Sequence, residues 1–98
     1  MILHRATSLF IDKFQAYSEE PDPVTGFDVA TTGRNVSHLL QERMSQLGFK
    51  RGSVEVMALE AFVDTMVDYG DSGMVPPYGT AFLQTARKKL ADAGPYLD

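Results

Sequence analysis

Apolar residues recur at helical spacing in four segments of this chain, and the stretches between them hold four of its five prolines and most of its glycines. In the first segment, residues 3–18, apolar side chains stand three or four positions apart, which is typical of an amphipathic helix. They are Leu3, Ala6, Phe10, Phe14 and Tyr17. Residues 19–26 contain two prolines and a glycine, so we expect the helix to end there.

Residues 27–47 predict a short extended segment followed by a second helix. Residues 27–31 alternate between apolar and polar at their start, which favours a strand. Asn35 is a good N-cap residue, and Gly48 stands where a helix commonly ends. The second helix should therefore run from Asn35 to Leu47.

Two further helices complete the predicted fold. Ser53 is placed to cap a third helix over residues 54–67, and a fourth is expected over residues 80–93, where a Gly-Pro pair stops it. The sequence thus predicts a mainly α protein with four helices in one compact domain over residues 1–98. A short strand near residues 27–31 is left open.

The third helix is apolar over most of its circumference, whereas an ordinary surface helix exposes about half of it. Its acidic residues, Glu60, Asp64, Asp68 and Asp71, stand four, four and three positions apart and should form one narrow solvated stripe. The remaining side chains need cover from two sides, and one side can be a second copy of the chain. We therefore predict a homodimer, intertwined or packed through this helix, with the interface residues Val54, Met57, Ala58, Ala61, Phe62, Val63 and Met66.

Composition narrows the class of protein. A chain of 98 residues with 44% hydrophobic and 22% charged residues is an ordinary globular domain. It has no cysteine, which excludes disulfides, thiolate nucleophiles and cysteine-ligated zinc. No apolar run reaches the roughly 20 residues that span a bilayer, and the first residues do not resemble a secretory signal. We expect a cytoplasmic protein without a membrane partner.

Charge is spread unevenly along the chain. The net charge is −4, so a polyanion would be repelled on average and nucleic-acid binding would need a local basic patch. Residues 34–52 carry four basic groups against one acidic group, whereas residues 53–78 carry five acidic groups and no basic one. Alternating patches of this kind favour self-association and protein partners.

The residues offer little for catalysis. His4 and His38, the two histidines, stand on different predicted helices with no carboxylate at ligand spacing. No serine has the context of a nucleophile elbow, and no glycine pattern could cradle phosphate. Asp64, Asp68 and Asp71 lack the loop spacing of a calcium site. We predict that the protein is not an enzyme and uses no cofactor or metal.

Two short stretches are candidate binding sites. Lys50, Arg51 and Ser53 stand at the start of the third helix, where free backbone N–H groups and the helix dipole favour a phosphate group. A capped turn with solvated basic side chains is the alternative. The loop over residues 70–79 holds Met74, Val75 and Tyr78, which either bind a partner or pack under the fourth helix.

One part of the chain holds the run Leu47-Gly48-Phe49-Lys50-Arg51-Gly52-Ser53-Val54, followed by Ala58-Leu59 and Phe62-Val63. This pattern gives residues 27–63 a resemblance to the ribbon-helix-helix family. The resemblance implies a strand that pairs with its symmetry mate, an intertwined dimer, and a second helix whose N-terminus holds a DNA phosphate. The chain departs from the family pattern at Gly52, and its candidate strand offers Asp28, Ala30 and Thr32 where base-reading side chains are expected.

The sequence therefore predicts a small homodimeric regulatory protein that acts by binding another protein, as an antagonist, adaptor or anti-activator. The alternative is a ribbon-helix-helix-like transcriptional regulator, in which Lys50, Arg51 and Ser53 hold the phosphate.

Overall fold

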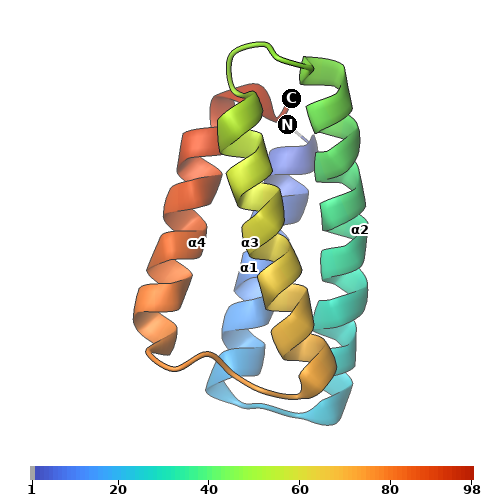
Figure 1. Ribbon diagram of the computed structural model, residues 1–98. Helices are drawn as coiled ribbons and strands as arrows, with labels where there is room; N and C mark the ends of the chain where they lie inside the picture. Colours follow the sequence, from blue (N-terminus) through green and yellow to red (C-terminus); the bar gives the residue numbers. More distant parts are fainter. Residues whose placement is uncertain (1) are drawn as a thin grey trace.

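Four helices form an up-and-down bundle in which each helix runs antiparallel to the next one in sequence (Figure 1). The structure, a computed structural model, describes residues 2–98. Its helices are α1 (Ile2–Glu19), α2 (Pro23–Leu47), α3 (Ser53–Ser72) and α4 (Gly79–Ala93), and a short 3-10 turn, η1 (Gly94–Tyr96), follows α4. Each helix lies beside the next one in sequence, and α4 returns beside α1.

Helix α2 begins earlier than its sequence indicated. Residues 27–31 lie inside this helix, so the expectation of a strand there is wrong, and so is a helix start at Asn35. The helix is instead opened by Asp22, whose carboxylate accepts a hydrogen bond of 3.0 Å from the backbone N–H of Val24. Pro23 occupies the first helical turn, where its missing N–H costs nothing because that group would have no partner in the helix.

Helices α2 and α3 approach each other very closely. A Cβ atom added to Gly26 would lie 2.8 Å from the carbonyl oxygen of Gly70, and one added to Gly33 would lie 2.4 Å from Cγ2 of Val67. Both distances are shorter than a van der Waals contact, so only glycine fits at these positions. The glycines of α2 therefore serve helix packing and do not interrupt the helix.

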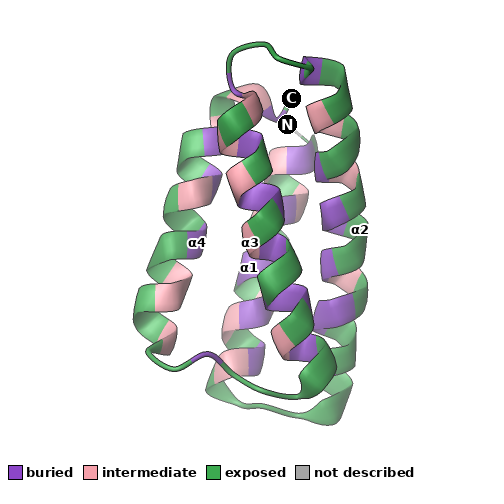
Figure 2. Ribbon diagram, in the orientation of Figure 1, coloured by how far each residue is buried: buried purple, intermediate pink, exposed green. Residues whose placement is uncertain are grey.

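The core fills the space between the four helices, and the buried faces of the ribbons point inward (Figure 2). Phe82 of α4 connects three helices, because its ring centroid lies 4.7 Å from that of Phe62 and 5.6 Å from those of Phe14 and Tyr69. The predicted stripe of the first helix is confirmed in large part. Leu3, Phe10, Phe14 and Tyr17 are buried, and Ala6 is partly buried.

Glycine shapes the connection between α2 and α3. Gly48 has a φ of 59° and its N–H donates to the carbonyl of Met44, so the predicted end of the helix at Leu47 is confirmed. Gly52, and not Ser53, occupies the N-cap position of α3, with a φ of 95°. The ring of Tyr96 packs on Gly52 so closely that a Cβ atom there would lie 2.2 Å from it.

Candidate functional site

The circumference of α3 divides into a core side, a side against α2 and an outer side. Val63 and Met66 lie in the core of the chain itself, with 1% and 0% of their surface exposed, so the prediction that they face a second copy is wrong in this fold. Phe62 is partly buried because it packs against Phe82. The sequence pattern alone could not distinguish these buried residues from the exposed ones, since it does not show which helix packs against each apolar side of α3.

The other predicted interface residues lie on the outer side. Val54 is 70% exposed and Met57 is 55% exposed. Ala61 is exposed as well, and Ala58 is partly exposed. We call Val54, Met57, Ala58 and Ala61 the outer face of α3. They recur at helical spacing on the side opposite the buried Val63, so they form one continuous apolar strip.

The acidic residues of α3 hold this helix to α2. The expectation of a solvated stripe is wrong for Glu60, which is buried and lies between the two helices, whereas Asp64, Asp68 and Asp71 are exposed. Oγ of Ser37 lies 2.8 Å from Oε1 of Glu60 and 2.7 Å from Oδ1 of Asp64. Further along the helix, Asp71 forms an ion pair with Arg34 of α2.

Ser37, Gln41, Glu60 and Asp64 form a cluster that has too few hydrogen-bond donors for two ionised carboxylates. The single hydroxyl proton of Ser37 is shared between Glu60 and Asp64, and Gln41 donates a further hydrogen bond of 3.2 Å to Glu60. Burial raises the pKa of Glu60, and the neighbouring carboxyl of Asp64 raises it further, against the opposing effect of the hydrogen bonds from Ser37 and Gln41. The folded protein therefore retains a proton on Glu60 at a higher pH than the unfolded chain does.

Glu60→Gln should stabilise the protein at neutral pH, on the order of 1 kcal/mol, because the amide keeps hydrogen bonds to its neighbours without a buried charge. Below the ordinary pKa of 4.5 both states of the wild type carry the proton, and the two proteins should be equally stable. As the pH rises toward the higher pKa of the folded state, the wild type loses stability relative to the variant. Urea unfolding across this range measures the difference. The exposed Glu20→Gln serves as the control, and a constant difference at all pH values would contradict the proton on Glu60.

The loop between α3 and α4 holds its apolar residues outward. Met74, Val75 and Tyr78 are all exposed, as a partner-binding loop requires. The loop is nonetheless fixed, because Pro76 is buried and the buried Tyr17 donates a hydrogen bond of 2.7 Å from its hydroxyl to the carbonyl of Met74. A protein partner would therefore meet a preformed surface.

Tyr78 has a strained backbone and an exposed ring. Its φ of 58° and ψ of 50° lie in the left-handed region, which residues other than glycine, asparagine and aspartate seldom adopt. Its side chain is 87% exposed, so packing of the ring does not compensate for this strain. Backbone strain of this kind is concentrated at functional sites, so Tyr78 is the residue of the loop that most strongly indicates a binding role.

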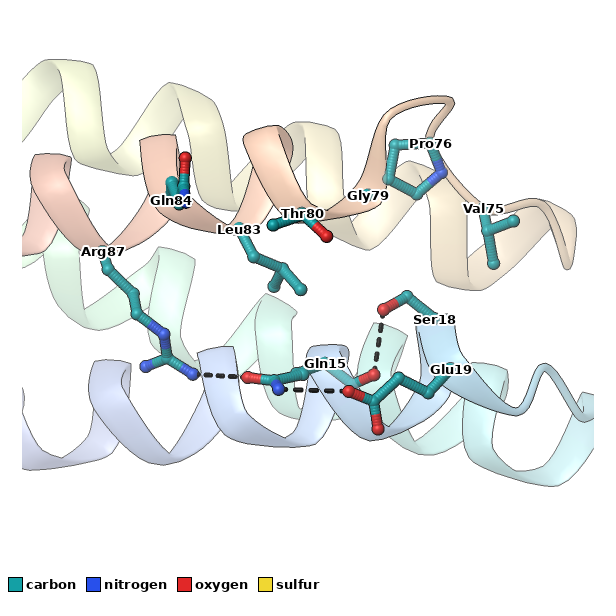
Figure 3. Close-up of a pocket in the computed structure, with 10 residues that line it drawn as sticks. All are labelled: Gln15, Ser18, Glu19, Val75, Pro76, Gly79, Thr80, Leu83, Gln84 and Arg87. Atoms are coloured by element: carbon teal, nitrogen blue, oxygen red, sulfur yellow. Dashed lines mark hydrogen bonds between the residues drawn. The ribbon is translucent and has the colours of Figure 1, made fainter.

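A groove of about 460 Å³ runs from this loop between α1 and α4 (Figure 3). Val75 and Pro76 lie at one end of the groove, and Leu83 points into it from α4. Arg87, also on α4, reaches across the groove, and its guanidinium donates to Gln15 of α1, which donates in turn to Glu19. This groove could not be predicted from the sequence, since its walls belong to segments that are more than 50 residues apart.

The predicted phosphate site lies at the opposite end of the bundle from this loop. Lys50 and Arg51 are exposed, and Ser53 is partly buried in the first turn of α3. Among the described residues, neither cation forms an ion pair. Phosphate binding there stays a prediction. Residues 27–31, which the ribbon-helix-helix resemblance assigns to a strand, are helical.

Comparisons with known proteins add no family: no family model, curated protein or solved structure matches this chain. Over residues 2–98, no helix is both long enough and apolar enough to cross a membrane. In the same part of the chain, no three histidine or acidic side chains gather as a metal site would require.

Proposed function

We propose that the protein is a small homodimeric regulator that pairs through the outer face of α3 and acts by binding another protein. The observation that carries this proposal is the exposure of Val54 and Met57 on a helix whose two flanks are already covered by α2 and α4. Contiguous exposed apolar surface of this kind marks interaction sites in soluble proteins. The two alanines of the strip, Ala58 and Ala61, let a second helix approach closely.

Charge favours an antiparallel arrangement of the two copies. In the turn before α3, Lys50 and Arg51 are exposed, whereas Asp64 and Asp68 stand exposed toward the other end of this helix. Antiparallel pairing centred near Met57 and Ala58 brings the basic turn of each copy toward the acidic part of the other. Parallel pairing would place like charges together, which is unfavourable.

The remaining surface is available for a different protein. The α3–α4 loop with Met74, Val75 and Tyr78 extends beyond the C-terminal end of α3, away from the centre of the proposed contact between copies. A dimer would therefore present two such loops. This arrangement supports an adaptor or antagonist that binds its target through preformed apolar side chains.

Cross-linking tests the proposed pairing, because the chain has no cysteine of its own. Ala58→Cys should form an intermolecular disulfide under mild oxidation, since residues near a two-fold axis meet their own symmetry mates and a disulfide needs Cα atoms about 4.4–6.8 Å apart. Thr31→Cys, at an exposed position of α2, is the matched control and should remain largely monomeric on a non-reducing gel. Equal cross-linking of both variants, or none at Ala58→Cys, would contradict the proposal.

A further inference from the structure

We propose that the end of the bundle formed by the α1–α2 connection and the α3–α4 loop binds a protein segment in which basic residues stand beside apolar ones. This inference rests on the proposed function, in that it names the chemistry of the protein that the regulator binds. We call this end the loop end, and both connections lie there together (Figure 1). Its exposed apolar residues are Val24, Phe27, Met74, Val75 and Tyr78.

The apolar side chains of the loop end come from the beginning of α2 and from the α3–α4 loop. Phe27 of α2 is 70% exposed and borders a hollow of about 420 Å³, whose other wall is the last turn of α3 and Gly73. Met74 borders a second hollow with Tyr69 and Thr65, and Val75 lies at the mouth of the groove between α1 and α4. Hollows lined by exposed apolar side chains can take up the side chains of a bound segment.

The charge around these hollows is negative. Glu19 at the end of α1 is exposed, and so are Glu20 and Asp22 in the α1–α2 connection. Glu19 lines the groove that also contains Val75, and Asp22 lines the hollow that also contains Phe27. Each of these two acidic residues therefore stands beside an exposed apolar one.

The nearby cations are already engaged by acidic side chains. Arg87 forms an ion pair with Asp12, Arg34 forms one with Asp71, and Lys13 forms one with Asp28. Among the described residues, Glu19, Glu20 and Asp22 form no ion pair, and neither does Asp68, which lines the hollow beside Met74. Charge complementarity thus selects a partner segment with lysine or arginine and disfavours an acidic one.

The loop end is also prepared for binding before a partner arrives. The hydrogen bond from Tyr17 to Met74 and the buried Pro76 fix the loop, so little conformational entropy is lost on association. The left-handed backbone of Tyr78 directs its ring into solvent. A rigid exposed aromatic residue is the usual anchor of a protein–protein contact.

Selection from a library of random peptides displayed on phage, with the full-length protein as bait, tests this inference. The enriched peptides should combine lysine or arginine with leucine, methionine or aromatic residues. Tyr78→Gly should weaken the binding of a synthetic enriched peptide by at least about tenfold, as expected for an anchor residue. This variant suits the left-handed backbone, so it should remain folded and its loss of binding cannot come from unfolding. Glu19→Gln combined with Glu20→Gln should weaken binding and reduce its dependence on salt.

The control variant Met57→Ser lies on the outer face of α3 and should bind the peptide as the wild type does. The inference is overturned if no peptide is enriched, if the enriched peptides are acidic, or if Tyr78→Gly binds them equally well. Peptides that bind the outer face of α3 would overturn it as well, while the proposed binding of another protein would stand. A protein that is monomeric but still binds basic peptides at Tyr78 would refute the homodimer and leave this inference intact.

Discussion

Gly33→Leu is expected to lower the free energy of unfolding by about 3 kcal/mol or more, or to prevent folding altogether. The reason is the close approach of α2 and α3, since even a Cβ atom at this position would lie 2.4 Å from Val67 and 2.9 Å from the ring of Phe10. Both neighbours are buried in the core, and the valine side chain has little rotational freedom with which to move away. Urea unfolding followed by circular dichroism measures the loss.

Gly79→Ala is the matched control for this variant. Gly79 also lies in a helix, but an added Cβ atom there would meet no other atom within 4 Å. Helix propensity should then make the control as stable as the wild type or slightly more stable. A Gly33→Leu protein with the urea midpoint of the wild type would show that α2 and α3 are farther apart than the structure places them.

Gly26 and Gly33 explain why the start of α2 was predicted wrongly from the sequence. Proline and glycine between residues 21 and 33 lower the local propensity for helix, and local propensity was all that the pattern offered there. Tertiary packing reverses this preference, because Gly26 and Gly33 are the positions at which α3 comes closest. Their separation of seven residues, two helical turns, was the signal that could have revealed a packed helix face.

The candidate site was predictable in part. The apolar circumference of α3 correctly indicated cover on several sides, and Val54 and Met57 are exposed as such a contact would require. The sequence could not show which apolar residues of α3 are buried within the chain and which are exposed. Val63 and Met66 are buried only because of where the neighbouring helices lie. The exposure of Asp64, Asp68 and Asp71 was expected from their spacing, but the burial of Glu60 was not, since its hydrogen-bond donor Ser37 lies on another helix.

Met57→Glu is expected to raise the dissociation constant of the proposed dimer at least about 100-fold. Near the two-fold axis the two new carboxylates would face each other, and each would replace an apolar side chain. The monomer should remain folded, because Met57 is 55% exposed and a substitution at such a position changes stability by about 0.5 kcal/mol or less. Sedimentation velocity over a dilution series gives the dissociation constant.

Val24→Glu provides the comparison. Val24 is more exposed than Met57 and belongs to the loop end, so the same charge there should leave dimerisation unchanged. If Val24→Glu dissociates the dimer as strongly as Met57→Glu does, a general effect of added negative charge is responsible. If Met57→Glu leaves the dissociation constant of the dimer unchanged, the outer face of α3 is not the interface.

The most direct test of the central claim is the mass of the wild-type protein in solution, measured by sedimentation equilibrium at increasing concentration. A single chain has a mass of 10.8 kDa. If the outer face of α3 pairs with a second copy, the mass should rise to twice this value in the wild type and remain that of one chain in Met57→Glu. A wild-type mass of one chain at every concentration up to the solubility limit would contradict the claim that the outer face of α3 pairs with a second copy.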